Sequence, residues 1–293
     1  MRLRLLRGDI SRARASCIVT SANDALVGNE QPLYWRFTSR KNVDGAVREA
    51  AGPQLRQACL EFPALEAAVD AMEEEPRDIS RWAETAKRGS STTLRCAPGA
   101  AVVTRGFGLD CDWCVHAVAP DSEFGYEGHY QGQPGIRGEE VRARSSPPLR
   151  RLRQTYEAAL AACHRRGAET AALPALGAGV KGWRPSISAA MCLDALCRDA
   201  ERGRFAEVSV VLGSDDAWVA FGKAFSALVG DADEDVSAGE RVWHVADADA
   251  RLPFDGDDAT LDLARIPELA PRPAANTRGY SGDFWNPTNN GWR

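Results

Sequence analysis

The chain has 293 residues, of which 44% are hydrophobic and 26% charged, and its formal net charge is −5. This length and composition predict one substantial core with room for extensions, and the acidic balance argues against a dedicated nucleic-acid-binding protein. No apolar run approaches the roughly 18 residues that a membrane-spanning helix needs. The eight cysteines are scattered through apolar stretches and no signal peptide precedes the first predicted strand, so we expect a cytoplasmic or nuclear protein.

The N-terminal segment predicts two strands. Residues 2–6 alternate and indicate a short edge strand, which ends at a turn containing Asp9. Asp9 is either a plain turn residue or an acceptor for the amino group of a base. Residues 15–20 predict a second, apolar strand that runs into a polar turn carrying Asn23.

A long loop and a helix follow this turn. Residues 28–42 contain Tyr34, Trp35 and Phe37, and loops of this length usually act as functional lids or are disordered. The aromatic residues favour an ordered loop, packed on the body or placed over a ligand. From Asp44 the apolar spacing is helical, and Gly52-Pro53 is expected to kink or divide the helix.

Asn23 and Asp44 therefore stand at the same end of a strand-to-helix connection. Backbone N–H groups at a helix N-terminus are unpaired and the helix dipole favours anions, so this end can hold a phosphorylated ligand. A carboxylate beside such a ligand is more useful as a base than as a contact.

The middle of the chain contains two predicted surface insertions. Residues 62–94 are polar, acidic and helical in character, and residues 120–148 form a loop rich in Gly, Pro and Ser. Between them, residues 100–104 and 114–118 predict strands. A helix over residues 149–163 follows the second insertion.

The remaining elements predict an α/β sandwich. A strand over 171–176, a glycine loop and a helix over 186–200 come first, and a strand over 208–212 and a final helix come next. Alternating strands and helices place ligands at the carboxyl edge of the sheet. After residue 230 the chain becomes acidic and then rich in Pro, Asn and Gly. We interpret residues 231–293 as an extension that wraps the 1–230 domain or hangs free.

The glycine loop, Gly177-Ala-Gly-Val-Lys-Gly182, matches G-x-G-x-x-G between a strand and a helix. A dinucleotide-binding site would place this motif in the first βαβ unit, with an acidic residue about twenty positions later. Here the motif is late and Asp194 comes too soon. We favour a loop whose N–H groups cradle a diphosphate, with a mere tight turn as the alternative.

Other reactive residues do not form a recognisable set. Cys111-Asp-Trp-Cys114 lacks a second ligand pair, and His116 lies in a buried strand, as a core histidine would. We therefore expect neither a metal nor a cofactor. The arginine-rich segment 137–153 is interpreted as solvated surface, and RNA binding through it is the weakest functional hypothesis.

Eight segments, in this order, resemble the macro domain family and span about residues 1–230. They are Gly8-Asp9-Ile10, Val19-Thr-Ser-Ala-Asn23, Asn42-Val-Asp-Gly-Ala-Val47, Ala50-Ala-Gly52, Cys96-Ala-Pro-Gly-Ala100, Gly106-Phe-Gly-Leu109, Val115-His-Ala-Val-Ala-Pro120 and Gly177-Ala-Gly-Val-Lys-Gly182. The resemblance implies a three-layer α/β/α sandwich with a mixed central sheet that binds ADP-ribose, here with a C-terminal extension.

The resemblance also implies roles for individual residues. Asp9 would hold the adenine amino group and Ile10 would line its pocket. Asn23 would hold the distal ribose, and Asp44 would position or activate a water molecule. The glycine loop and its flank would contact the ligand through Gly177, Ala178, Gly179, Val180, Lys181, Gly182 and Trp183.

The implied reaction removes mono-ADP-ribose from modified acceptors or deacetylates O-acetyl-ADP-ribose, and it requires no metal and no covalent nucleophile. The expected partners are ADP-ribose and ADP-ribosylated proteins or small-molecule esters, with no membrane or nucleic acid, and we expect a monomer. The alternatives are a non-catalytic ADP-ribose reader and an ADP-ribose 1″-phosphate phosphatase.

Several positions depart from the family pattern. Thr20 replaces an asparagine, the aromatic loop 28–42 replaces a run of glycines, and Arg48 stands where a histidine is often found. The adenine-stacking aromatic is missing at 213–214, where Trp218 is a candidate substitute. Trp35, Phe37 or Trp183 would either close over the distal ribose or serve packing alone.

Overall fold

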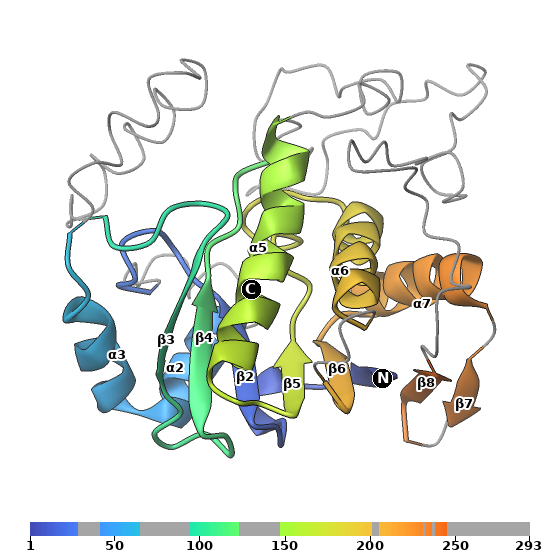
Figure 1. The fold of residues 1–293 in the computed structure, drawn as a ribbon, viewed down its shortest axis with the longest axis horizontal. Coiled ribbons are helices and arrows are strands. Elements are labelled where there is room, and N and C mark those ends of the chain that lie inside the picture. The colour runs from blue at the N-terminus through green and yellow to red at the C-terminus, as the bar shows by residue number, and fades with distance from the viewer. Residues whose placement is uncertain are drawn as a thin grey trace, which may run out of the picture.

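A mixed sheet with eight strands among the described residues forms the centre of the computed structural model, in the order β3-β4-β2-β5-β6-β1-β8-β7 (Figure 1). The strands are β1 (Arg2–Arg7), β2 (Cys17–Ser21), β3 (Ala101–Arg105), β4 (Trp113–Ala117), β5 (Thr170–Leu173), β6 (Glu207–Leu212), β7 (Asp233–Asp235) and β8 (Glu240–His244). From β4 to β1 in this order the strands run parallel, whereas β3, β8 and β7 pair antiparallel with their neighbours.

The structure describes residues 1–28, 42–64, 94–122, 147–200, 205–230, 232–235 and 238–244. The predictions for the aromatic loop, including Tyr34, Trp35 and Phe37, fall outside these residues. So do most of the two predicted insertions and the chain beyond residue 244.

Helices cover both faces of the sheet. They are η1 (Ile10–Arg12), α2 (Val43–Ala51), α3 (Pro53–Leu60), α5 (Pro147–Arg165), α6 (Pro185–Ala200) and α7 (Asp215–Val229). Successive strand residues point to opposite faces, so Val19 packs in the core under α5, α6 and α7 while Ile18 packs against η1, α2 and α3. The predicted three-layer α/β/α sandwich is confirmed (Figure 1).

The predicted division of the first long helix is also confirmed. Gly52 has φ +84°, and its N–H donates to the Arg48 carbonyl at 3.0 Å, which ends α2. Pro53 then begins α3, a position at which its missing N–H costs nothing. At the other end of α2, Asn42 accepts a hydrogen bond from the Gly45 N–H at 2.7 Å and caps the helix.

The prediction that β1 is an edge strand was wrong. β1 pairs with β6 on one side and with β8 on the other, where Leu3 lies opposite Trp243. The Trp243 side chain is 2% exposed, stacks edge-on against Phe225 with ring centroids 5.5 Å apart, and donates from Nε1 to the Gly230 carbonyl at 2.9 Å. The sheet therefore continues past the boundary expected at residue 230.

Among the described residues, no helix combines the length and the apolar character that crossing a membrane requires.

Candidate functional site

The parallel strands end at one edge of the sheet, and the segments that follow them meet there. The Gly8 N–H after β1 donates to the carbonyl of Leu212, the last residue of β6, at 3.0 Å. The Ser122 N–H in the segment after β4 donates to the Lys181 carbonyl in the segment after β5, at 2.8 Å. The structure thus places the candidate residues that follow β1, β2 and β5 at the carboxyl edge of the sheet, the edge at which the alternation of strands and helices led us to expect a ligand.

Asp9 and Ile10 follow β1 at this edge but differ in exposure. Asp9 is exposed and accepts a hydrogen bond from the Ser11 N–H at 2.9 Å, which caps η1. Ile10 is only 3% exposed and packs in the core beneath α2. Asp9 can reach a ligand, whereas Ile10 offers it little surface.

Asn23 builds the turn after β2. Its Nδ2 donates to the Gly28 carbonyl at 2.9 Å, and its Oδ1 accepts from the Val27 N–H at 3.1 Å. Both ends of the amide therefore close the segment 23–28, in the manner of Asn residues that satisfy their own turns.

The glycine loop presents backbone donors. Gly177 and Gly182 have φ of +78° and +76°, and the Gly182 N–H closes a turn onto the Gly179 carbonyl at 3.0 Å. The N–H groups of Gly179, Val180 and Lys181 donate to no described residue, and Val180 is 61% exposed. Successive unpaired N–H groups form a concave site that suits an anion.

Trp183 supports this loop from below. Its indole Nε1 donates to the Pro120 carbonyl at 2.8 Å, and the side chain is 2% exposed. A Cβ on Gly177 would lie 2.7 Å from Trp183 Cδ1, so the loop backbone rests directly on the ring. Of the two roles left open for Trp183, the structure shows packing.

Two residues that the sequence analysis did not select also fix the loop. The Tyr156 hydroxyl accepts from the Leu176 N–H at 2.8 Å and lies 2.7 Å from Ser188 Oγ, which donates to the Leu176 carbonyl at 2.8 Å. The sequence signal for this role was a tyrosine on an apolar helix face. Such a tyrosine is expected to be buried, and a buried hydroxyl needs a hydrogen-bond partner.

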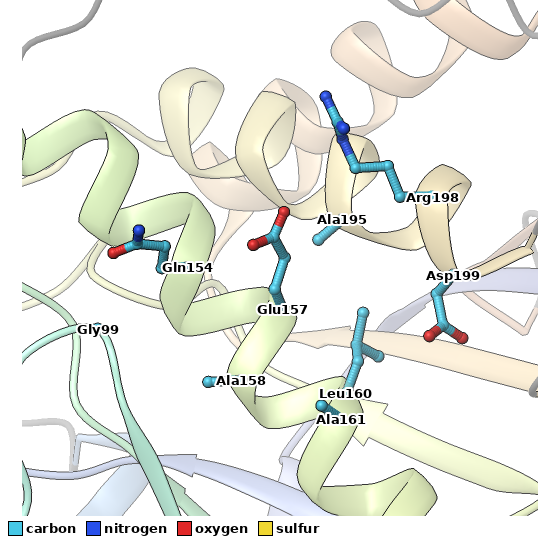
Figure 2. Close-up of a pocket in the computed structure, with 9 residues that line it drawn as sticks. All are labelled: Gly99, Gln154, Glu157, Ala158, Leu160, Ala161, Ala195, Arg198 and Asp199. Atoms are coloured by element: carbon cyan, nitrogen blue, oxygen red, sulfur yellow. The ribbon is translucent and has the colours of Figure 1, made fainter. Parts of the chain in front are cut away.

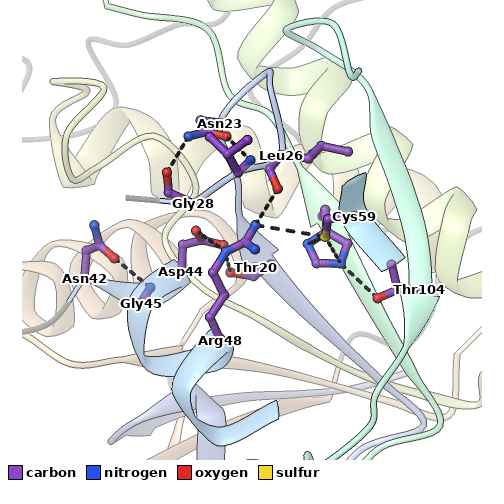
Figure 3. A network of polar contacts seen from close by, with 12 residues as sticks. Thr20, Asn23, Leu26, Gly28, Asn42, Asp44, Gly45, Arg48, Cys59 and Thr104 are labelled. Atoms are coloured by element: carbon purple, nitrogen blue, oxygen red, sulfur yellow. Dashed lines mark hydrogen bonds and ion pairs between the residues drawn. The ribbon is translucent and has the colours of Figure 1, made fainter. Parts of the chain in front are cut away.

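Asp44 is buried in a polar network that links α2 to the turn after β2 (Figure 3). Its Oδ2 lies 2.8 Å from Arg48 Nε, and its Oδ1 accepts from Thr20 Oγ1 at 3.4 Å. Arg48 Nη2 donates to the Leu26 carbonyl at 3.1 Å. A Cβ on Gly28, whose φ is +77°, would lie 2.6 Å from Arg48 Nε, so the turn also rests on the guanidinium.

The network holds its charges in a desolvated place. Burial raises the pKa of Asp44, and the charge and hydrogen bond of Arg48 oppose this effect. His116 lies beside them and is fully buried, with Nε2 2.9 Å from Thr104 Oγ1 and 3.6 Å from Cys59 Sγ. Burial and the Arg48 charge lower the pKa of His116 to about 3, so its imidazole is neutral.

Two other features lie apart from these residues. A cavity of about 480 Å³ opens between α5 and α6, and none of the predicted site residues lines it (Figure 2). The lining residues are Gly99, Gln154, Glu157, Ala158, Leu160, Ala161, Ala195, Arg198 and Asp199.

Trp218, the candidate for adenine stacking, is 5% exposed. The guanidinium carbon of Arg7 lies 4.9 Å from its ring centroid and that of Arg241 lies 5.2 Å from it.

Within the described part of the chain, no group of three or more His, Cys, Asp or Glu side chains is arranged to hold a metal ion.

Comparison with known proteins shows which proteins this chain is similar to. No family model matches the chain. It is 28% identical over 187 residues to an O-acetyl-ADP-ribose deacetylase of Enterobacter sp. (strain 638), covering 64% of this chain and 72% of that protein. It is 26% identical over 197 residues to a macro domain-containing protein of Vibrio parahaemolyticus, covering 67% of this chain and 82% of that protein.

Solved structures show a similar fold. The Oceanobacillus iheyensis macrodomain with MES bound aligns with a TM-score of 0.52 and 21% identity, covering 78% of this chain and 92% of that one. The chain has the macro domain fold and is related to macro domain proteins. The resemblance noted in the sequence is thereby confirmed, and this chain carries a buried Asp44–Arg48 pair at the carboxyl edge of its sheet.

Proposed function

We propose that this macro domain binds ADP-ribose, free or attached to a protein or a small-molecule ester, at the carboxyl edge of the sheet. The observation that carries the proposal is the row of N–H groups from Gly179 to Lys181, which donate to no described residue and include the exposed Gly179 and Val180. A diphosphate matches such a row because its oxygens accept hydrogen bonds and its charge suits the aligned dipoles. A macrodomain of the same fold from Oceanobacillus iheyensis was solved with ADP.

The remaining contacts follow from positions along the edge. Lys181 adds a positive charge beside the diphosphate, although it also pairs with Asp121 at 3.1 Å. Asp9, exposed after β1, would accept from the adenine amino group. The distal ribose would then lie toward the turn that Asn23 closes and toward Asp44.

Calorimetric titration of the full chain with ADP-ribose, ADP and AMP tests this proposal. We expect ADP-ribose to bind most tightly and AMP most weakly, because AMP lacks the second phosphate and the distal ribose. Absence of ADP-ribose binding would overturn the proposal. Equal affinities for ADP-ribose and AMP would show that the glycine loop does not hold a diphosphate.

A second candidate function is hydrolysis at the distal ribose. Two relatives from Enterobacter, 28% and 25% identical, are named O-acetyl-ADP-ribose deacetylases, and Asp44 lies in this chain at the carboxyl edge of the sheet. In deacetylation the oxygen of water bonds to the acetyl carbon and the ester C–O bond breaks. Asp44 would take the proton of water and return it to the departing ribose oxygen, leaving acetate and ADP-ribose.

In the removal of mono-ADP-ribose from an acceptor, the same water would attack C1″ of the distal ribose, and the bond between C1″ and the acceptor would break. Product analysis with O-acetyl-ADP-ribose and ADP-ribosylated protein, for wild type and Asp44→Ala, tests both reactions. Release that depends on Asp44 supports the hydrolase, and binding without release supports a reader. Inorganic phosphate released from ADP-ribose 1″-phosphate would identify the phosphatase alternative.

A further inference from the structure

The Asp44 carboxylate is already engaged inside the protein. Arg48 Nε lies 2.8 Å from its Oδ2, and both side chains are shielded from solvent, with 14% of Arg48 and 8% of Asp44 exposed. A general base must offer a lone pair to a water molecule, and a carboxylate held by a guanidinium is both occupied and less basic. The pair as a whole carries no net charge.

We propose that Arg48 is a positioning residue that withholds the Asp44 carboxylate from base catalysis, so that this macro domain retains its ligand and hydrolyses it slowly. Removing the Arg48 charge should then release a faster, Asp44-dependent hydrolase. This inference rests on the proposed binding of ADP-ribose, and its substrate class is the ester or acceptor bond at the distal ribose.

The contacts of Arg48 support a restraining role. The guanidinium bridges Asp44 on α2 and the Leu26 carbonyl in the turn after β2, and the backbone of Gly28 rests on it (Figure 3). Arg48 Nη1 is buried and has no hydrogen-bond partner among the described residues. A buried donor without a partner is costly, and a buried ion pair seldom adds net stability over apolar groups of similar size. Stability alone therefore gives little reason for an arginine at this position.

The groups that surround the Asp44 carboxylate or its partner Arg48 come from four elements. They are Thr20 on β2, Arg48 on α2, Cys59 on α3, and His116 and Cys114 on β4. Burial raises the pKa of both thiols, and His116 is neutral, so the positive charge among these described groups is that of Arg48. Without it, only the hydrogen bond from Thr20 opposes the effect of burial, and the pKa of Asp44 rises toward the range in which a carboxylate is an effective base.

The chain offers a matched control on another helix. Arg198 and Asp194 form a pair with the same i,i+4 spacing on α6, with Arg198 Nε 3.1 Å from Asp194 Oδ2 and the Asp194 side chain fully buried. Removing Arg198 also takes the paired cation from a buried carboxylate, with the Arg153 charge remaining nearby, but this carboxylate lies among helix residues that are not part of the candidate site. Arg198→Gln therefore reproduces the structural damage without touching Asp44.

The experiment compares wild type with Arg48→Met, Arg48→Gln, Arg48→Lys and Arg198→Gln. Met keeps an apolar stem under Gly28, so it is the variant best suited to preserve the turn. For each protein, ADP-ribose affinity, O-acetyl-ADP-ribose hydrolysis from about pH 5 to 9 and thermal stability are measured, because general base catalysis follows the ionisation of the base. Asp44→Asn is added to the Arg48→Met background to identify the base.

We expect Arg48→Met and Arg48→Gln to hydrolyse the ester about tenfold faster than wild type or more, with a rate that rises through one ionisation and is lost with Asp44→Asn. General acid–base catalysis typically contributes about 10²–10⁴-fold, which leaves room for a gain of this size when the base is released. Arg48→Lys keeps the positive charge and should therefore gain less turnover than Arg48→Met, and Arg198→Gln should lose stability without gaining turnover. Unchanged or slower hydrolysis by Arg48 variants that still bind ADP-ribose would overturn the inference alone. If wild type binds no ADP-ribose, the proposed function fails, and this inference fails with it.

Discussion

The Nε of Arg48 and the Oδ2 of Asp44 lie 2.8 Å apart, one helical turn from each other on α2, at the carboxyl edge of the sheet. This contact bears on both the fold and the proposed reaction. It places a positive charge beside the carboxylate that hydrolysis would need, and the same guanidinium supports the turn that Asn23 closes. Changes at either residue should therefore affect both stability and ligand chemistry.

The first prediction concerns the stability of this pair. Asp44→Ala leaves the Arg48 guanidinium buried and uncompensated, so we expect the free energy of unfolding to fall by about 3–5 kcal/mol. The double variant Asp44→Ala/Arg48→Met removes both charges and should be more stable than Asp44→Ala alone. Urea unfolding of wild type, both single variants and the double variant forms a double-mutant cycle. Losses that simply add would show that the two side chains do not depend on each other.

The second prediction separates two glycines in one loop. Gly177 has φ +78°, and an added Cβ would meet Trp183 Cδ1 at 2.7 Å, whereas nothing lies within 4 Å of a Cβ on Gly179. We expect Gly177→Ala to lower the free energy of unfolding by about 1–3 kcal/mol through overpacking and a strained backbone. Gly179→Ala should stay within about 0.5 kcal/mol of wild type, as exposed substitutions usually do.

For Gly179→Ala we expect a larger effect on ligand affinity than on stability. Its N–H is one of those assigned to the diphosphate, and a methyl group there would stand between the backbone and the phosphate oxygens. Gly179→Ala should therefore weaken ADP-ribose binding in calorimetry while the unfolding curve is unchanged. An unchanged affinity in this variant would place the diphosphate elsewhere.

Much of the fold was predictable because its signals are local. Apolar runs such as residues 17–20 and 208–212 became buried strands, and the order of strands and helices predicted which loops meet at one edge. Asn23, Asp44 and the glycine loop were selected for this reason. Residues 240–244 were missed as a strand because Trp243 and Val242 stand among charged residues. Only the pairing with β1 places Trp243 opposite Leu3 and gives Glu240 the Arg4 side chain as a partner.

The site was less predictable, because side-chain partners are set by packing. The sequence contains Asp44 and Arg48 at the i,i+4 spacing of a helical ion pair, but spacing alone does not reveal that both are buried. Trp183 was a candidate lid, and only the fold places it beneath Gly177. Tyr156 acts on the Leu176 backbone, twenty residues away, through a contact that no local pattern encodes.

The third prediction concerns pH and His116. Its pKa is lowered from 6.5 to about 3 in the folded protein, so between these values the unfolded chain binds a proton that the folded protein does not. The stability that this residue contributes is complete above pH 6.5 and is lost as the pH falls toward 3. His116→Gln should therefore lose less stability than wild type between about pH 7 and pH 5.

Urea unfolding at both pH values measures this difference. Asp44, whose pKa is raised, contributes with the opposite sign in both proteins and so does not distinguish them. Equal losses in wild type and His116→Gln would contradict a neutral, buried imidazole.

The fourth prediction locates the end of the folded unit. A chain ending at Gly230 lacks β8, so β1 becomes an unpaired edge and Phe225 loses its contact with Trp243. Loss of a buried tryptophan typically costs about 3–5 kcal/mol, and an unpaired strand edge invites association with other chains. We therefore expect a chain ending at His244 to be more stable in urea than one ending at Gly230, and to show less association in light scattering. Trp243→Ala in the longer chain should reproduce most of the stability loss without removing the strand, which separates the anchor from the edge. If the two truncated chains are equally stable, β8 adds nothing to the sheet and the domain ends at residue 230.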